Sequence, residues 1–402
     1  MNNKEFDIAI VGGGIVGLSS AYKLQLEFPE LKIVILEKED ELASHQSGRN
    51  SGVIHSGLYY KPESFKARNC VEGRKQLLDF AIQNQIAHDI CGKIVLATNS
   101  FEASQLPRLK KNGEKNGLKG IEIIDKKQIK EIEPYADGIS ALWVPETGII
   151  DYKSVTNKFA EKIVSINSKS KIEKNCEVLD VSDELLFSTK GKIKAKNIIF
   201  CVGLFSDRLA KKDNLDLSIR IVGFRGDYFK INNEAKHTVS NLIYPVPNPE
   251  FPFLGVHFTR MVDGSVECGP NAVFTFKREG YKKTDFSLND TFDALSFLGT
   301  WRLFINHWKF GLNEYRRAFS KRLFLNELKK MIPTLKLNDI TECGSGVRAM
   351  ALNKNGEIID DFCIVQNNKN IHVLNAPSPA ATACMSIGDH VKDFAIENFK
   401  LK

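Results

Sequence analysis

The sequence predicts a mixed α/β fold, α+β overall, in which a discontinuous βαβ domain is interleaved with a domain built on an antiparallel sheet. Two observations carry this prediction. The first 40 residues alternate an apolar strand, a glycine-rich turn, a helix and a second apolar strand. A very apolar strand at residues 197–203 has the same buried character, whereas residues 219–269 contain strands rich in aromatic residues and prolines.

The glycine-rich turn identifies the first unit. Gly12, Gly14 and Gly17 form G-x-G-x-x-G directly after a strand, and Glu37 ends the second strand twenty residues past Gly17. The first glycine permits the tight turn, the second lets the backbone approach a pyrophosphate, and the third lets helix and strand pack closely. The helix N-terminus faces the phosphate charge, and Glu37 can accept from a ribose hydroxyl. We therefore expect a Rossmann-like dinucleotide-binding unit.

The remaining elements follow from periodicity, turn residues and helix stops. Helices are expected at residues 64–90, 100–116, 126–132, 152–166 and 206–211, and over most of 287–332. Strands are expected at residues 93–97, 177–181, 185–188, 192–194 and 197–203, with a last strand starting at residue 371 and leading through a loop into a final helix.

The length of 402 residues exceeds what one core usually supports, so two domains are expected. We assign residues 1–80, 141–215 and 341–402 to the nucleotide-binding domain. Residues 81–140 and 216–340 are assigned to a substrate-binding domain.

Composition excludes several classes of protein. The 56 basic and 49 acidic residues give a net charge of +7, spread along the chain, so nucleic acid is not an expected partner. The eight cysteines lack C-x-x-C pairs and matching histidines, so no metal site is expected. The first strand starts near residue 5 and no apolar run reaches the ~20 residues of a spanning helix, so we expect a cytoplasmic protein.

Residues 301–332 mix aromatic and basic side chains, a composition that also suits a helix lying on a membrane surface. A helix packed on its own core with a basic outer face is the interpretation we favour. Peripheral contact with the inner membrane stays open.

The interleaving favours FAD over a nicotinamide cofactor, because a Rossmann unit that binds NAD is normally completed before the substrate domain begins. The loop of residues 44–60 is small, polar and glycine-rich, as expected of backbone that runs against a cofactor ring. Val53, Ile54 and Leu58 give this loop an apolar component that favours burial.

Several blocks resemble the L-2-hydroxyglutarate dehydrogenase/oxidase family, which belongs to the FAD-dependent, D-amino-acid-oxidase-like flavoproteins. The blocks are residues 47–64, 224–228, 243–247, 251–259, 269–273, 346–349 and 375–382, and the resemblance runs from about residue 5 to the C-terminus. It implies oxidation of L-2-hydroxyglutarate to 2-oxoglutarate with FAD, after which the electrons pass to quinone or oxygen. Residues 384–387 are only loosely similar to the family.

The motif and the resemblance together give an expected cofactor-binding set. It comprises Gly12, Gly14, Gly17, Glu37, Lys38, Ser44, His45, Ser47, Asn50, Ser51, Val178, Gly203, Arg348, Pro377, Ala380, Ala381 and Thr382. Asn50 and Ser51 are expected at the flavin ring. Residues 375–382 precede a helix and would present N–H groups to the flavin pyrimidine oxygen.

Oxidation of a 2-hydroxy acid needs a base for the hydroxyl proton, and histidine suits this role near neutral pH. His55 and His257 are the candidates. We favour His55, which is closer in sequence to the loop expected at the flavin, and keep His257 as the alternative or as a partner that orients the hydroxyl. A purely structural role remains open for each.

A dicarboxylate substrate calls for cationic groups, preferably arginine. Arg348, between small residues, is expected to contact a substrate carboxylate or the reduced flavin, and a structural ion pair is the alternative. Arg225 is a second candidate, with pairing to Asp227 an equal alternative. Further candidates for the substrate-binding set are Tyr59, Tyr60, Tyr244 and His257.

Two other functions compete with this interpretation. One is a flavin oxidase of an amino acid such as glycine or sarcosine, which would need a site for an uncharged amine. The other is a flavin-binding assembly or tRNA-modifying factor without small-molecule turnover. The lack of a basic aromatic surface counts against the latter.

Overall fold

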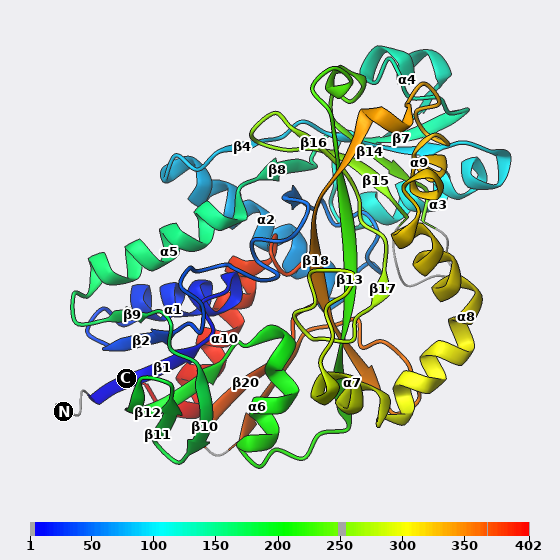
Figure 1. The fold of residues 1–402 in the computed structure, drawn as a ribbon. Coiled ribbons are helices and arrows are strands. Elements are labelled where there is room, and N and C mark those ends of the chain that lie inside the picture. The colour runs from blue at the N-terminus through cyan, green and yellow to red at the C-terminus, as the bar shows by residue number, and fades with distance from the viewer. Residues whose placement is uncertain (1–4, 248–254, 368, 402) are drawn as a thin grey trace.

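The computed structural model describes residues 5–247, 255–367 and 369–401. Two large sheets make up most of the molecule, and a long pair of strands of the second sheet runs through its centre (Figure 1). Phe251 to Leu254, part of one block that resembles the family, lie outside the described residues.

The first sheet contains the βαβ unit. Its order is β10-β11-β12-β1-β2-β9, with β20 beside β12 and β19 beside β20. The core pairs β1–β12, β1–β2, β2–β9 and β12–β20 are parallel. The strands are β1 Glu5–Val11, β2 Ile33–Leu36, β9 Lys171–Glu173, β10 Val178–Ser182, β11 Leu185–Ser188, β12 Gly191–Phe200, β19 Cys363–Asn367 and β20 Asn370–Asn375.

Four helices bury their apolar sides against one face of this sheet (Figure 1). They are α1 Ile15–Glu27, α2 Phe65–Gln83, α5 Tyr152–Ile166 and α10 Cys384–Phe399. Side-chain caps fix two of their starts: Ser64 accepts from the N–H of Ala67, and Asp151 accepts from those of Lys153 and Ser154. The opposite face packs against the β10–β11 hairpin and α6 Ser206–Lys212.

The second sheet has the order β17-β13-β16-β15-β14-β5-β7-β6, with β18 beside β13. Its strands are β5 Lys93–Ala97, β6 Glu122–Asp125, β7 Ser140–Val144, β13 Ile219–Ile231, β14 Leu242–Pro245, β15 His257–Arg260, β16 Val266–Gly269, β17 Val273–Phe274 and β18 Ile340–Asn353. A small third sheet joins β3 Val53–Ile54, β8 Gly148–Ile150 and β4 His88–Asp89.

The remaining helices surround the second sheet (Figure 1). They are α3 Ser100–Lys115, α4 Lys126–Ile132, α7 Leu288–Leu295, α8 Leu298–Phe319 and α9 Lys321–Leu328, and short 3₁₀ turns occur at Gly203–Phe205, Lys236–Thr238 and Leu337–Asp339. Within the described part of the chain, none of the helices has both the length and the apolar character needed to cross a bilayer.

Most expected elements are confirmed, and α4 and α5 have the expected bounds. Three expectations need correction. Residues 192–194 and 197–200 belong to one strand, β12, because it pairs first with β11 and then with β1 and β20. The second sheet is not wholly antiparallel, since β14 runs parallel to β5. The expected helix at 64–90 ends at Gln83.

The proposed boundaries at residues 141 and 341 fall inside the strands β7 and β18. Both strands belong to the second sheet as a whole. The division into two domains otherwise stays a prediction.

Candidate functional site

One cavity of about 1210 Å³ runs from the glycine-rich turn to the second sheet. Four parallel strands of the first sheet, β1, β2, β12 and β20, end at it, and the residues that follow them line it. Ligands of open α/β sheets bind at this position, outside the carboxyl ends of the strands. The cavity is therefore the candidate active site.

The glycines of the turn have the roles that their spacing predicts. Gly12 has a φ of +110°, and a side chain there would bring a Cβ within 2.3 Å of the carbonyl oxygen of Cys201. A Cβ on Gly17 would lie 2.2 Å from the carbonyl oxygen of Gly12, so α1 approaches the strand at van der Waals limits. Gly14 is the N-cap of α1 and has no side chain to cap it. The Ser47 hydroxyl accepts from the N–H of Ile15 at 2.9 Å.

Glu37 lies at the end of β2 and is 7% exposed. Its carboxylate accepts from the N–H of Gly13 at 2.7 Å and from that of Glu39 at 2.9 Å. These two bonds hold both oxygens at the cavity wall, next to the glycine turn. The position suits a carboxylate that accepts from a ribose hydroxyl.

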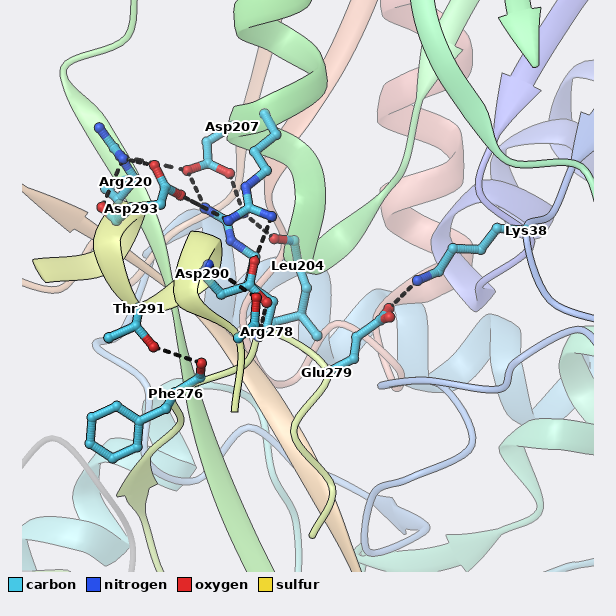
Figure 2. A network of polar contacts seen from close by, with 12 residues as sticks. Lys38, Leu204, Asp207, Arg220, Phe276, Arg278, Glu279, Asp290, Thr291 and Asp293 are labelled. Atoms are coloured by element: carbon cyan, nitrogen blue, oxygen red, sulfur yellow. Dashed lines mark hydrogen bonds and ion pairs between the residues drawn. The ribbon is translucent and has the colours of Figure 1, made fainter. Parts of the chain in front are cut away.

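Residues 276–286, called here the strap, connect β17 to α7 and lie against this end of the cavity (Figure 2). Within the strap, Arg278 forms a two-pronged pair with Asp207 at 2.5 and 2.9 Å and contacts Asp293 at 2.6 Å. The next residue, Glu279, pairs with Lys38, the residue after Glu37. The strap is thereby tied to the βαβ unit by ion pairs.

His45 joins the same cluster. Its Nε2 contacts Glu39 at 2.8 Å and Glu279 at 3.1 Å, and the Tyr281 hydroxyl lies 2.5 Å from its Nδ1. The three groups Glu39, His45 and Glu279 are of metal-ligand type, but Lys38 contacts both carboxylates and supplies the positive charge there.

The far end of the cavity combines imidazoles, tyrosines and a guanidinium. His257 donates through Nδ1 to the carbonyl of Gly255 at 2.9 Å, which leaves Nε2 with its lone pair. The Tyr244 ring stacks on this imidazole at 3.9 Å. Arg348, on β18 opposite Phe224, donates to the carbonyl of Asn271 at 3.2 Å. His55, Tyr59 and Tyr60 complete this end of the wall.

Both histidines are neutral at physiological pH. Burial lowers the pKa of His55 to about 3, and Lys93 and His257 add to this effect. Burial likewise lowers the pKa of His257 to about 3, against the opposing effect of its bond to Gly255. Burial also raises the pKa of Tyr59 well above its usual value, so its phenol stays a hydrogen-bond donor. The imidazoles of His55 and His257 can therefore accept a proton without first losing one.

Most residues expected from the sequence meet in this cavity. The lining includes Gly12, Gly14, Glu37, Lys38, Ser44, His45, Ser47, Asn50, Ser51, His55, Tyr59, Tyr60, Val178, Gly203, Tyr244, His257, Arg348, Pro377, Ala380 and Ala381.

Three expected residues do not line it. Gly17 lies behind the turn and packs against Gly12. Thr382 is fully buried, where its hydroxyl accepts from the N–H of His55 at 3.0 Å and bonds to Tyr152, so it supports the loop rather than facing the cavity. Arg225 pairs with Asp227 at 2.8 Å and donates to the carbonyl of Lys282, so the ion-pair alternative replaces its expected substrate contact.

The sequence reasoning missed Lys93, which begins β5 and is 1% exposed. Its only signal was a charged residue at the head of an otherwise apolar strand. It also missed Arg278, whose neighbours in sequence give no sign of burial, and Gln46, whose side chain accepts from the N–H of Ala349 at 3.0 Å.

Comparison with known families decides the class of the protein. Residues 7–394 match the DAO family, described as FAD dependent oxidoreductase. The chain belongs to this family. As an FAD-dependent oxidoreductase it is an enzyme, and its cavity joins a dinucleotide-binding turn to a chemical site, as that class requires.

Curated relatives of this oxidoreductase share a single name. L-2-Hydroxyglutarate dehydrogenase of Indibacter alkaliphilus is 45% identical over 98% of this chain and 100% of its own length. The Escherichia coli K12 enzyme of that name is 41% identical over 96% and 92%, and the mitochondrial enzyme of Bos taurus is 39% identical over 100% and 90%.

Solved structures confirm the fold. α-Glycerophosphate oxidase from Mycoplasma pneumoniae with FAD bound superposes with a TM-score of 0.79 at 22% identity, covering 99% of this chain and 96% of that one. Glycine oxidase from Bacillus cereus gives 0.71 at 16% identity, covering 99% and 96%.

Proposed function

We propose that this FAD-dependent oxidoreductase oxidises L-2-hydroxyglutarate to 2-oxoglutarate. The observation that carries the proposal is the far end of the cavity, where two neutral histidines, the buried His257 and the partly buried His55, lie with Arg348 and tyrosines. A 2-hydroxy dicarboxylate needs these groups: a proton acceptor for its hydroxyl and positive charge with donors for its carboxylates. The name shared by the curated relatives supports the same substrate.

The near end of the cavity fits the adenosine diphosphate half of FAD. A Cβ at Gly14 would meet only the Ser47 hydroxyl, at 3.2 Å, so the space above the start of α1 is bordered by backbone and a small polar group. The N–H groups of α1 would face the pyrophosphate, and Glu37 would accept from the ribose. Lys38, Ser44, His45, Val178 and Gly203 would border this half.

The flavin half would lie between the loop of Asn50 and Ser51 and the segment of Pro377, Ala380 and Ala381. Small residues in that segment let backbone approach a planar ring. Arg348 would supply positive charge on the same side. Bound FAD supplies the acceptor for the hydride that leaves the substrate Cα.

In the proposed mechanism His55 takes the hydroxyl proton. Its backbone is fixed to Thr382, beside the segment expected at the flavin, and its side chain makes no hydrogen bond to the described residues. The low pKa keeps the imidazole unprotonated, so the lone pair is available before substrate binds. His257, whose Nε2 also carries a lone pair, is the alternative acceptor. Arg348 and Tyr60 would hold the carboxylate next to the hydroxyl.

Anaerobic reduction of the bound flavin tests this function. L-2-Hydroxyglutarate should bleach the flavin absorbance of the purified holoenzyme, while glycine and sarcosine should not. Bleaching by the amines and not by the hydroxy acid would establish the amino-acid oxidase alternative. Absence of bleaching by every small acid and amine would favour a factor without turnover.

The proposal includes quinone as the electron acceptor, reached at the surface of the inner membrane by an otherwise cytoplasmic protein. It is supported by an apolar stripe of exposed side chains: Trp301 and Ile305 lie on α8 before a kink at His307, Trp308 and Leu312 follow the kink, and Leu288 and Phe292 lie on the neighbouring α7. The exposed Arg302, Lys309 and Arg316 flank the stripe. Aromatic and basic side chains around an apolar face suit a monotopic contact with anionic lipid, and oxygen remains the alternative acceptor.

A further inference from the structure

Lys93 is a buried lysine at the edge of the substrate end of the cavity. It begins β5, which lies between β14 and β7, and only 1% of its surface is exposed. Among the described residues no carboxylate pairs with its ammonium. Burial of an ammonium without a counter-ion is costly, so such a lysine either loses its proton or receives an anion from a ligand.

Two tyrosines separate this ammonium from the cavity. The Nζ atom lies 4.6 Å from the centre of the Tyr59 ring and 4.8 Å from that of the Tyr244 ring, within the range of cation–π attraction. Both tyrosines line the cavity, and Tyr244 also stacks on His257. The buried Tyr59 hydroxyl has no hydrogen-bond partner among the described residues. A donor without an acceptor, backed by a cation, is a site for an anionic oxygen.

A second lysine–tyrosine pair shows what is unusual about the first. Lys66 lies 4.9 Å from the ring centre of Tyr60, also at the cavity, but its ammonium contacts the Asp360 carboxylate at 2.5 Å. Lys66 thus has a carboxylate partner, the largely exposed Asp360, whereas Lys93 has none among the described residues.

We propose that Lys93 is a specificity-determining residue that, acting through Tyr59 and Tyr244, selects substrates with a second carboxylate. The inference rests on the proposed oxidation of a 2-hydroxy acid and adds to it the origin of dicarboxylate selectivity. The Tyr59 hydroxyl donates to the distal carboxylate, and the ammonium behind the rings supplies the compensating charge. A substrate with a methyl group at this end leaves both groups unsatisfied.

Because the charge of Lys93 changes with pH, binding of a dicarboxylate should depend on pH. Burial lowers the pKa of Lys93 to about 7. The surrounding groups titrate at other pH values: burial raises the pKa of Cys70 to about 12 and raises those of Tyr59 and Tyr244. Burial lowers the pKa of both His55 and His257 to about 3. The other cationic side chains at this end of the cavity are Lys66, which is paired with Asp360, and Arg348. An anion at Tyr59 favours the protonated lysine, so binding takes up a proton above pH 7 and weakens as the pH rises further.

The test compares L-2-hydroxyglutarate with L-2-hydroxyvalerate, which has the same carbon chain and one carboxylate. Lys93→Met, which keeps the length of the side chain, should raise KM for the dicarboxylate by about 10- to 100-fold with little change in kcat, and change kcat/KM for the monocarboxylate by less than about 3-fold. The rise of the dicarboxylate KM between pH 7 and 9 should disappear. Lys66→Met is the matched comparison and should keep the selectivity of the wild type.

Retained selectivity in Lys93→Met, or loss of selectivity in Lys66→Met instead, would overturn the assignment. A wild-type enzyme that oxidises neither acid would refute the proposed function rather than this inference alone. If the variant does not fold, calorimetry of glutarate binding to the wild-type holoenzyme decides the question. At pH 8 the binding heat should depend on the ionisation enthalpy of the buffer because a proton is taken up, and the lack of such dependence would sink the inference.

Discussion

At the level of single residues, burial decides what each ionisable group does. His55 and His257 have a pKa of about 3 because the cavity wall removes them from water and cationic neighbours oppose their protonation. An ordinary surface histidine would be half protonated near pH 6.5. These two instead stay available as proton acceptors over the whole physiological range.

The first prediction concerns these histidines. His55→Ala should lower the rate of flavin reduction by substrate about 10²-fold or more, because the hydroxyl proton loses its acceptor. His257→Gln, which can still bond to Gly255, should change the rate less if His55 is the base. Stopped-flow absorbance under anaerobic conditions measures both rates. The reverse order of effects would transfer the role to His257.

The wild-type rate also has an expected pH dependence. Since the imidazole is deprotonated above its pKa of about 3, kcat/KM should show no acid limb between pH 8 and pH 5 from this group. An acid limb near pH 6.5 in the wild type that disappears in the His55 variant would contradict the low pKa.

At the level of elements, the strap is a short connection whose position depends on buried ion pairs rather than on regular structure. Arg278 is 4% exposed, and its partner Asp207 is fully buried on α6 (Figure 2). Glu279 follows directly and reaches Lys38 and His45 at the cavity. The ion pairs of Arg278 thus fix the position of Glu279, which contacts Lys38 and His45 at the proposed cofactor end of the cavity.

The second prediction follows from this coupling. Arg278→Ala removes the bidentate partner of the buried Asp207 and leaves it only the more distant Arg220, at 3.9 Å, which should lower the free energy of unfolding by about 3–5 kcal/mol and speed the release of FAD. Chemical denaturation and the recovery of flavin fluorescence on release measure the two effects. Lys153→Ala, which removes an exposed ion pair with Glu41, is the control and should leave the free energy of unfolding and the retention of FAD close to those of the wild type. Normal FAD retention in the Arg278 variant would separate the strap from the cofactor.

The helices α7 and α8 differ from the strap, whose charges are buried: these two helices expose apolar side chains. The expected basic outer face of residues 301–332 is only part of what the helix exposes: Arg302, Lys309 and Arg316 are exposed, but Ile305 and Trp308 are also 69% and 60% exposed. A large exposed apolar surface generally marks a binding site.

The third prediction addresses this face. Ile305→Glu should reduce co-sedimentation of the holoenzyme with anionic vesicles and slow reduction of a lipid-dissolved quinone, while leaving flavin reduction by substrate unchanged. Val164→Glu, at an exposed apolar position on α5 on the other side of the molecule, is the control (Figure 1). Equal vesicle binding by both variants and the wild type would remove the membrane from the proposal.

At the level of the whole molecule, the cavity exists because two sheets are held against each other by β13 and β18. The two strands pair over their whole length, from Ile219 opposite Asn353 to Ile231 opposite Ile340. Arg348, which lies within this paired stretch of β18, lines the cavity. The core of the first sheet then holds the cofactor end, and the second sheet holds the substrate end.

The fourth prediction concerns the stability of the whole protein in acid. The buried histidines have folded pKa values of about 3 against 6.5 in the unfolded chain, so the unfolded state binds more protons between these values. Their contribution to stability is present above pH 6.5 and is lost as the pH falls toward 3. Denaturant titrations at several pH values should show a smaller loss for His257→Gln than for the wild type, and the exposed His237→Gln should follow the wild type. A parallel loss in all three would exclude the buried imidazole as a cause.

The sequence allowed the βαβ unit, its glycines and the loop beside it to be predicted because their chemistry is local. A turn that needs a positive φ at Gly12, a helix start without a side chain at Gly14 and an acid at the end of the next strand all lie within a short stretch of chain. Residue blocks of family type also indicated His55, His257 and Arg348, which all line the cavity.

Other features depended on segments far apart in the chain. From the sequence, Arg348 was expected to contact an anion, whereas a substrate contact and a pair with Asp227 were equal alternatives for Arg225. The register of β13 and β18 brings Arg348 to the cavity and leaves Arg225 with Asp227. Lys66 likewise has a carboxylate partner in Asp360, almost 300 residues away in the chain, whereas Lys93 has none among the described residues. By itself the sequence determined the dinucleotide-binding unit and the family, because short spacing fixes backbone geometry. Only the tertiary structure decided which charges are buried, paired or left for a ligand, because desolvation and ion pairing depend on which distant segments meet.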